Sequence, residues 1–550
     1  MKNNDLQKLF ILLALSFVFL MLGNNILSLT NPDEVFYTGT AKEMIQQKTW
    51  LVPYLFGQPQ FEKPILTYWL LRVGLMFFGA TGFGARFFPA LFGMIGVIAV
   101  YVFCLRCLGN REKAFLCAFV LMTSGLFMGL ARTVFTDMIF SIFILLSFIS
   151  FFLGYTQKAA KSAGIIFFFI FAALAVLTKG PLGLFIPLLA VVIFLSSRRE
   201  LGFMWCKYSA WGFLLFLLIA APWYIFMIKN FGDSFIQEFF YNDHIRRLLE
   251  AEHKKNDTWY FYPLTTVLCF FPWSIFTVAG FVFLLRKLKE KDAPPIYSFL
   301  ASWIITTLVI FQIAHSKLVS YVFPVFPALA IITGDFIHEA IVRNKRLIYF
   351  ISLATLIIFI LFPIGLVFAA FKYPMYVDKT GSFYLLVAAI FFVFVAGLII
   401  LVRNQRYFAY LIAFNMLTIF FCVFFSQRLF DDYVSSKAAV DYLKKNCPAG
   451  DVILSSKFFA RGVRFYSERD VAVTNLGGTN FFSPHPIPFL DSDEKIEHFL
   501  NTQKVTSAVL NKGSFMDMER IARNKFKLSL LKKIGNEHIM VIQTLNRDAP

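Results

Sequence analysis

Acidic side chains recur where long apolar segments end, in positions where a membrane protein could hold a charged substrate. Asp33 and Glu34 follow the first apolar segment directly, in the run Asn31-Pro32-Asp33-Glu34. Holding two carboxylates beside lipid is unfavourable, because an ionised group loses hydration near hydrocarbon. The pair therefore indicates either a cap for the helix that follows or a site where a carboxylate takes part in a reaction.

Further ionisable groups stand at the ends of later apolar runs. Glu62 and Lys63 precede one run, Asp137 begins another, and Lys179 lies between two runs in Thr178-Lys179-Gly180-Pro181. Lys317 lies in a similar polar turn. Glycine and proline account for a tight turn but not for its lysine, which could instead reach lipid headgroups. Together the groups suit a reaction in which cations stabilise a leaving phosphate and a carboxylate stabilises positive charge or accepts a proton.

The polar stretch at residues 229–262 is rich in basic groups. It carries His244, Arg247 and His253. Binding of a lipid phosphate would explain these residues, and a solvated surface is the alternative. His244 could also ligate a divalent ion with Glu62, although two ligands distant in sequence form a weak metal signal.

Composition places these groups in a membrane. The chain has 550 residues, 58% of them hydrophobic, only 15% charged and 72 of them phenylalanine, which indicates a polytopic membrane protein. The net charge of +19 is spread in short clusters between apolar runs, as in cytoplasmic loops, and does not indicate a nucleic-acid partner. The seven cysteines predict no disulfide framework.

Apolar runs of spanning length predict about 13 transmembrane helices. The expected spans are residues 9–29, 83–104, 114–130, 138–155, 164–177, 182–195, 210–228, 263–285, 297–313, 322–337, 347–370, 383–402 and 407–425. Basic clusters fall on one side only if residues 65–78 do not cross, so we interpret this segment as an interfacial helix on the outer surface, with a second at 38–47.

Two domains follow from this topology. Residues 1–425 form the transmembrane domain, with 31–81 as its first outer loop, and residues 426–550 form a small extracytoplasmic α/β domain. The odd number of crossings puts the second domain on the same side as the acidic and basic groups described above.

These motifs resemble those of GT-C membrane glycosyltransferases, and within them the lipid A 4-amino-4-deoxy-L-arabinose transferases, which are related to protein O-mannosyltransferases. The motifs lie between residues 1 and 330: Asp33-Glu34 with Tyr37, Phe61-Glu62-Lys63-Pro64, Arg132 through Asp137, Thr178-Lys179-Gly180-Pro181, His244 with Arg247, His253-Lys254 before Trp259-Tyr260, and Lys317-Leu318 with Tyr321 and Pro324. Phe36, Gln60 and Ile65 depart from the family pattern, which leaves the sugar open.

The resemblance implies roles for individual residues. Asp33 is the expected principal catalytic carboxylate, with Glu34 and Asp137 as the other catalytic acids. The remaining roles are donor phosphate binding by Lys63, Arg247, Lys179 and Lys317, pocket lining by Tyr37, Tyr321 and His253, and binding of a zinc, magnesium or manganese ion by Glu62 and His244. No cofactor is certain.

The implied activity is transfer of a sugar from undecaprenyl phosphate to lipid A, a modification linked to polymyxin resistance. The expected setting is the bacterial inner membrane, with the active site and the second domain in the periplasm and the protein acting as a monomer. A protein O-mannosyltransferase-like enzyme with another acceptor is the nearest alternative. A lipid transporter is a more distant one, because its charges are expected near the midplane of the bilayer.

Overall fold

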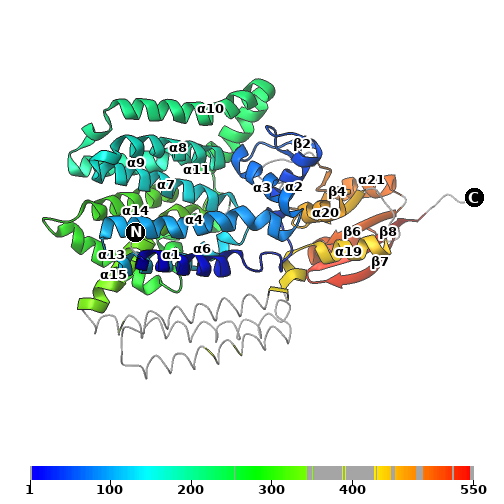
Figure 1. The fold of residues 1–550 in the computed structure, drawn as a ribbon. Helices are drawn as coiled ribbons and strands as arrows, with labels where there is room; N and C mark the ends of the chain where they lie inside the picture. Colours follow the sequence, from blue (N-terminus) through cyan, green and yellow to red (C-terminus); the bar gives the residue numbers. More distant parts are fainter. Residues whose placement is uncertain are drawn as a thin grey trace, which may run out of the picture.

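The computed structural model is a bundle of long helices with a small sheet domain at one end (Figure 1). It describes residues 3–252, 254–343, 427–428, 430–447, 452–478, 487–503, 505–522 and 525–545, and the single positions 350, 387 and 391. The predicted spans at 347–370, 383–402 and 407–425 lie almost entirely outside the described residues. They therefore stay predictions.

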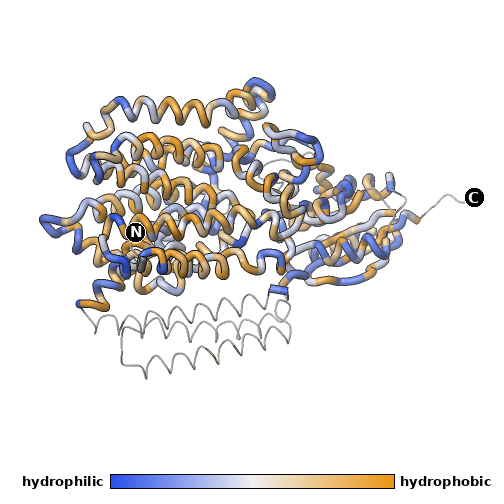
Figure 2. Tube along the Cα trace, viewed as in Figure 1, coloured by the Kyte–Doolittle hydropathy of each residue, from blue (hydrophilic) through white to orange (hydrophobic). Residues whose placement is uncertain are grey.

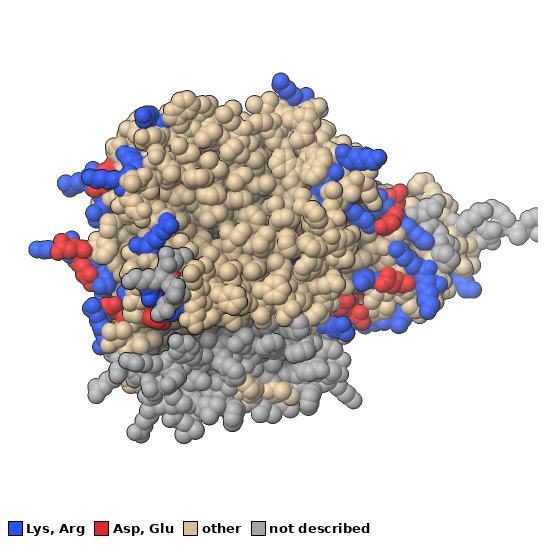
Figure 3. Space-filling view, in the orientation of Figure 1, with Lys and Arg blue, Asp and Glu red and all other residues tan. Residues whose placement is uncertain are grey.

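The bundle has the surface that a bilayer requires. Figure 3 shows Lys, Arg, Asp and Glu gathered at its two ends, with a broad uncharged band between them, and Figure 2 shows the apolar residues running along its helices. In the described part of the chain, six helices are long and apolar enough to cross a membrane, or eight if each of two bent pairs forms one span. The polytopic membrane class is thus confirmed, while the number of spans remains a prediction.

The helices of the bundle follow the apolar runs of the sequence. Their bounds are α1 (Asn3–Ser16), continued by the π-helix η1 (Phe17–Met21), α4 (Gly82–Leu108), α5 (Arg111–Met122), α6 (Gly125–Ala131), α7 (Thr136–Thr156), η2 (Lys158–Ala160), α8 (Lys161–Lys179), α9 (Leu182–Arg198), η3 (Leu201–Met204), α10 (Lys207–Phe235), η4 (Ile236–Arg246), α11 (Arg247–Leu249), η5 (Lys254–Asn256), α12 (Phe261–Cys269), α13 (Ser274–Lys289), α14 (Pro295–Ile313), η6 (Val319–Val325) and α15 (Phe326–Arg343).

Two predicted spans are broken rather than continuous. The segment predicted at 114–130 bends by 64° between α5 and α6, and the one predicted at 263–285 bends by 118° between α12 and α13. Pro272 lacks the N–H that would continue the second helix. The two breaks meet, because Gly125 N–H donates a hydrogen bond to the carbonyl oxygen of Phe271 at 2.8 Å. Each break thus satisfies backbone groups that the other exposes.

Helix α10 is longer than predicted. It continues through η4 and α11, so the chain stays helical to Leu249 where the sequence suggested an outer loop from residue 229. A kink at Gly232, where φ is 49°, turns the second half away from the first. The segment beyond this kink carries His244 to the end of α8, where it packs against Gly180.

Both helices predicted between the first two spans exist, and their place on the outer surface of the membrane remains a prediction. Helix α2 spans Asp33–Gln46, beginning five residues before the predicted start, and α3 spans Ile65–Phe78 as predicted. The short hairpin of β1 (Tyr54–Leu55) and β2 (Gln58–Pro59) joins them. The first turn of α2 therefore contains both acids, which suits the positive end of the helix dipole.

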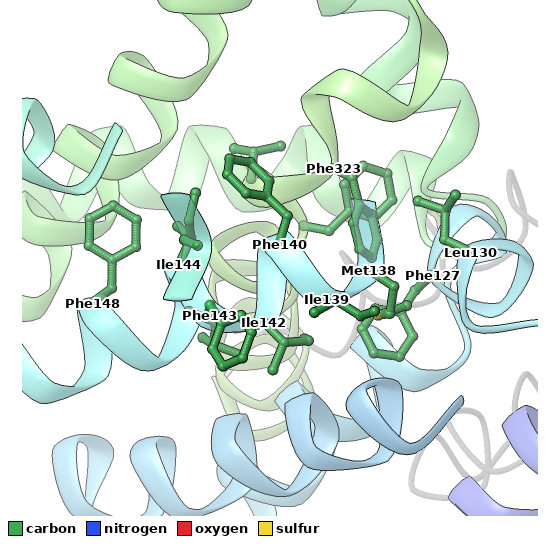
Figure 4. Packing of buried hydrophobic residues seen from close by; sticks show 14 of the residues in the cluster. Phe127, Leu130, Met138, Ile139, Phe140, Ile142, Phe143, Ile144, Phe148 and Phe323 are labelled. Carbon is green, nitrogen blue, oxygen red and sulfur yellow. The ribbon is translucent and has the colours of Figure 1, made fainter. Parts of the chain in front are cut away.

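Most residues of α7 are buried. Figure 4 shows Phe140, Ile142 and Phe143 among the buried side chains packed around this helix, with Phe127 and Phe323 from α6 and η6 close by. The rings of Phe127 and Phe323 have centroids 5.8 Å apart. This packing fixes the first turn of α7, where Asp137 stands.

The C-terminal part, called the soluble domain here, is an α/β domain, as predicted. Its strands are β3 (Val452–Ser456), β4 (Asp470–Thr474), β5 (Phe489–Leu490), β6 (Val505–Leu510), β7 (Phe526–Ile534) and β8 (Glu537–Thr544), and its helices are α19 (Lys437–Asn446), α20 (Ala460–Ser467), α21 (Asp493–Thr502) and α22 (Lys512–Ile521). The sheet order is β5-β4-β3-β6-β8-β7. In this order β5, β4, β3 and β6 are parallel to one another. Strand β8 pairs antiparallel with both β6 and β7.

The segment between η1 and α2 binds the domain to the bundle. Ser28 N–H donates to Asp431 Oδ1 at 2.8 Å, and Asn31 N–H donates to the Val434 carbonyl at 2.8 Å. The backbone just before Asp33 is therefore held by the soluble domain, so the position of this acid depends on both parts of the chain.

Candidate functional site

A cavity of about 550 Å³ lies where the bundle meets the sheet domain. Its walls come from the start of α2, the loop before α3, the starts of α7 and η6, the ends of α8 and η4, and loops of the soluble domain. These segments are distant in sequence, and the cavity is the place where the predicted charged motifs converge.

Asp33 lines this cavity and Glu34 does not. Asp33 makes no hydrogen bond or ion pair with the residues that the structure describes. Burial raises the pKa of its carboxyl above the usual value, and the positive charge of Arg461 opposes that rise. A raised pKa means that the ionised form is lost at a higher pH than for an exposed aspartate.

Glu34 lies behind its neighbour in a buried network. Its Oε1 and Oε2 accept hydrogen bonds from Arg86 at 2.7 and 2.5 Å, and the side chains of the pair are 1% and 3% exposed. Oε1 also accepts from Val134 N–H at 3.0 Å, and Oε2 accepts from the hydroxyl and N–H of Thr30. Glu34 thus joins α2, α4 and the connection between α6 and α7. Its side chain does not line the cavity, where the predicted catalytic role would require it.

Lys63 and Arg247 meet at a shared carboxylate. Lys63 Nζ lies 2.6 Å from Asp243 Oδ2, and Arg247 Nε lies 3.0 Å from Asp243 Oδ1. Arg247 also donates to the Tyr321 hydroxyl at 2.7 Å and lies 3.5 Å from Glu252. Lys63 and Arg247 therefore stand side by side at the cavity wall, each paired with a carboxylate, and charge-assisted hydrogen bonds from two adjacent cations suit a phosphate.

A second pair stands beside the first. Lys179 Nζ lies 2.6 Å from Asp137 Oδ1 and 4.6 Å from the centre of the Tyr321 ring. Asp137 is in the first turn of α7 and Lys179 in the last turn of α8, so each charge opposes the dipole of its own helix. Gly180 ends α8 with φ at 100°, a conformation that favours glycine.

Glu62 and Tyr37 complete the wall next to Asp33. Burial raises the pKa of Glu62, and the charges of Arg461 and Lys63 oppose the rise. The Tyr37 ring packs against Tyr68 and Phe135, with centroids 6.2 and 6.3 Å apart. An apolar wall of this kind strengthens electrostatic interactions inside the cavity.

Three further predicted site residues are placed elsewhere or are not described. Lys317 is not among the lining residues, and its Nζ lies 2.5 Å from Asp257 Oδ1. His244 packs against Gly180, and its Nδ1 lies 2.7 Å from the Phe239 carbonyl oxygen. His253 lies outside the described residues.

The described residues offer a metal no complete ligand set. Among them, no group of three or more His, Cys, Asp or Glu side chains could hold an ion. The Phe239 carbonyl engages Nδ1 of His244, which leaves Nε2 as the ring nitrogen that could bind an ion together with Glu62. A metal at this pair stays a prediction from the resemblance, and the chemistry below assigns no step to it.

The soluble domain supplies lining residues that sequence reasoning missed. They are Lys457, Phe458, Arg461, Asn475 and Asn511. The guanidinium carbon of Arg461 lies 4.4 Å from the centre of the Phe36 ring, so it reaches the helix that bears Asp33. A signal was available, because parallel strands in alternating α/β sequence predict ligand-facing residues just after each strand.

Comparison with known proteins agrees with this arrangement. Residues 8–232 match the family model described as dolichyl-phosphate-mannose-protein mannosyltransferase. The undecaprenyl phosphate-α-4-amino-4-deoxy-L-arabinose arabinosyl transferase of Wigglesworthia glossinidia brevipalpis is 30% identical over 72% of this chain and 71% of its own length. The transferase of the same name from Edwardsiella ictaluri is 27% identical, with 60% and 59% covered.

The alignments leave part of some relatives uncovered. An uncharacterised protein of Aquifex aeolicus is 30% identical over 61% of this chain, and the chain covers 65% of it. Fold similarity is more extensive than these alignments. The crystal structure of ArnT from Cupriavidus metallidurans bound to undecaprenyl phosphate superposes with a TM-score of 0.78 and covers 98% of this chain and 99% of its own, at 17% identity.

Sequence and fold therefore agree on one assignment, which confirms the resemblance drawn from the charged motifs. The chain belongs to the family of undecaprenyl phosphate-α-4-amino-4-deoxy-L-arabinose arabinosyl transferases, polyprenyl-phosphate-dependent glycosyltransferases with the GT-C fold.

Proposed function

We propose that this protein transfers 4-amino-4-deoxy-L-arabinose, or a related aminosugar, from undecaprenyl phosphate to lipid A at the periplasmic face of the bacterial inner membrane. The observation that carries the proposal is the convergence of Lys63 and Arg247 on Asp243, at the wall of a cavity that also contains Asp33. The names of the relatives supply the sugar and the carrier.

The first step that this geometry supports is binding of the carrier phosphate. Lys63 and Arg247 both contact Asp243, and their side chains are only 11% and 16% exposed. Charge-assisted hydrogen bonds in such a shielded site are stronger than in water. The Tyr321 hydroxyl, which accepts from Arg247 at 2.7 Å, fixes the direction of the guanidinium.

Transfer then breaks the bond between the anomeric carbon and the phosphate oxygen. The electron pair of that bond leaves with the phosphate, whose growing negative charge the two cations stabilise. An acceptor oxygen forms the new bond to the anomeric carbon from the opposite side, which inverts its configuration. The Asp33 carboxylate stabilises the positive charge that develops on the sugar, and it accepts the proton if the acceptor is a hydroxyl.

Asp137 and Lys179 have a supporting part in this scheme. Their 2.6 Å ion pair lies against the face of Tyr321, the same residue that orients Arg247. We expect the pair to hold Tyr321, and through it Arg247, in place, and so to help position the headgroup of the carrier.

The acceptor is the part of the proposal that most needs a test. Lipid A from cells with and without the protein would be compared by mass spectrometry, and the proposal expects a mass increase of one aminosugar only when the protein is present. In a reconstituted assay, Asp33→Asn should lose at least 100-fold in transfer rate. Asp292→Asn, which changes an exposed acid beyond α13, should retain full activity.

Other outcomes would redirect the assignment. Sugar on a protein and not on lipid A would favour the protein O-mannosyltransferase alternative, which the matched family model supports over residues 8–232. Movement of the lipid-linked sugar across vesicles without transfer would favour a transporter. The charged cavity lies beside the soluble domain, away from the uncharged band of the bundle in Figure 3, and this placement supports the enzyme over the transporter.

A further inference from the structure

Three parallel strands of the soluble domain end at the cavity. Lys457 follows β3 directly, Asn475 follows β4 and Asn511 follows β6, and all three residues line the cavity. The register of β3 with β4 and β6 brings these carboxyl ends to the same edge of the sheet. In open α/β sheets, ligands bind outside the carboxyl ends of parallel strands. The domain therefore presents its ligand-binding edge to the membrane site.

The chemistry of this edge is polar and cationic. Lys457 and Arg461 contribute two positive charges from the β3–α20 connection and the first turn of α20. Asn511 N–H donates to Ser456 Oγ at 2.9 Å, and Asn511 Oδ1 accepts from Ser514 N–H at 2.8 Å. These bonds fix the Asn511 side chain and leave its amide hydrogens as the group that it can offer a ligand.

This edge faces the bundle wall that holds the other cations. On that wall, Lys63 and Arg247 share Asp243, and Lys179 is paired with Asp137. Arg461 comes from the opposite part of the chain and reaches Phe36 on α2, so the segment bearing Asp33 lies between the two sets of cations. One phosphate on the bundle wall does not account for both sets. A transferase needs a second substrate on the far side of its reacting carbon.

We propose that this edge, formed by Lys457, Arg461, Asn475 and Asn511, is the acceptor site and binds a phosphorylated sugar headgroup. The cations bind the phosphate of the headgroup, and the asparagine amides bind its hydroxyl or carbonyl oxygens. This inference rests on the proposed transfer and adds the part of the chain that selects the acceptor. The rival reading is that Arg461 only balances Asp33 and Glu62 and packs on Phe36.

A binding experiment separates the two readings. The full-length protein in lipid nanodiscs would be titrated with a bisphosphorylated glucosamine disaccharide without acyl chains, in the presence of saturating undecaprenyl phosphate. Lys457→Gln and Arg461→Gln should each weaken binding of this probe at least tenfold, and Arg461→Lys should restore part of it. Lys445→Gln, an exposed lysine on α19, is the matched control and should bind as the unchanged protein does.

Two further measurements show whether the loss of binding is specific to the acceptor. The affinity for undecaprenyl phosphate should change less than twofold in Lys457→Gln, and the acceptor KM should rise in step with the loss of probe binding. Equal probe binding by all variants, or a parallel loss of undecaprenyl phosphate binding, would overturn the inference. Failure of the unchanged protein to transfer sugar to lipid A would instead contradict the proposed function, whereas transfer with an unaltered acceptor KM in the variants would contradict the acceptor site alone.

Discussion

The Lys63 ammonium lies 2.6 Å from the carboxylate of Asp243, although the two residues are 180 positions apart in the chain. One comes from the loop before α3 and the other from the π-helical continuation of α10. Because Asp243 also holds Arg247, it sets the spacing of the two cations that we assign to the carrier phosphate.

Removal of either cation should weaken binding of the carrier. Lys63→Ala and Arg247→Ala each delete charge-assisted hydrogen bonds to phosphate, which are worth roughly 1.5–3 kcal/mol, or about 10- to 100-fold in affinity. Binding of undecaprenyl phosphate would be measured by tryptophan fluorescence or calorimetry in detergent. Lys229→Ala, an exposed lysine on α10, serves as control and should leave the affinity unchanged. Wild-type affinity in both cavity variants would remove the assigned role.

Substitution of Glu34 should lower stability, whereas substitution of Asp33 should lower activity. Glu34→Ala leaves Arg86 as an uncompensated buried charge, which costs about 3–5 kcal/mol. Asp33→Asn should abolish transfer with a Tm close to that of the unchanged protein, because Asp33 has no ion pair among the described residues. Lys42→Ala, which breaks the more exposed pair with Glu468, should cost under about 1 kcal/mol. A catalytic loss without any loss of thermal stability in a Glu34 variant would contradict the structural role.

The contact between the segment before α2 and the soluble domain should be sensitive to a single methyl group. An added Cβ at Gly462 in α20 would overlap with the side-chain amide of Asn31, two residues before Asp33. Gly462→Ala should therefore lower stability by about 1–3 kcal/mol, although alanine favours the helix. At Gly513 in α22, the added Cβ would be 3.5 Å from Asn511 Oδ1, an ordinary contact.

Thermal denaturation and a transfer assay on both glycine variants check this prediction. Gly513→Ala should unfold at or above the Tm of the unchanged protein. Gly462→Ala should unfold at a lower temperature and transfer more slowly, because the segment before Asp33 must move. Equal behaviour of the two variants would show that the contact does not position the site.

Glu537 should make the soluble domain less stable as the pH rises. Burial raises the pKa of its carboxyl from the ordinary 4.5 to about 8, and its Oε1 is bonded to the Ser436 hydroxyl. Between these pH values only the unfolded chain releases the proton, so the free energy of unfolding falls with increasing pH. Glu537→Gln keeps the neutral form at every pH and should gain roughly 3 kcal/mol at pH 7 relative to the unchanged protein.

The measurement is the Tm at pH 5 and at pH 8. Glu537→Gln should raise the Tm clearly at pH 8 and much less at pH 5. Glu519→Gln, an exposed acid on α22, should show no pH-dependent difference. An equal gain at both pH values would mean that packing, and not ionisation, explains the effect.

Much of the architecture could be predicted because apolar length and basic clusters are local signals. The segment at residues 65–78 is found as α3 with the predicted bounds, and the C-terminal part of the chain forms an α/β domain as predicted. The bends between α5 and α6 and between α12 and α13 were not predicted. They depend on Gly125 bonding to Phe271, a contact between distant segments.

The same distinction applies to the site. The residue types of Asp33, Lys63 and Arg247 made them candidates, and the structure brings them to one cavity. Sequence alone could not tell Asp33 from Glu34, because the helix rotation that turns one to the cavity and the other to Arg86 is fixed by packing. Nor could it show that Arg461 reaches Phe36 on α2, because that contact depends on how the soluble domain docks.

The most direct test of this account is a structure of the protein with undecaprenyl phosphate bound, determined by cryo-electron microscopy in lipid. We predict that the phosphate lies between the Lys63 ammonium and the Arg247 guanidinium, on the side of the cavity that faces Asp33. A phosphate bound away from both cations, with Asp33 remote from the carrier headgroup, would contradict the account.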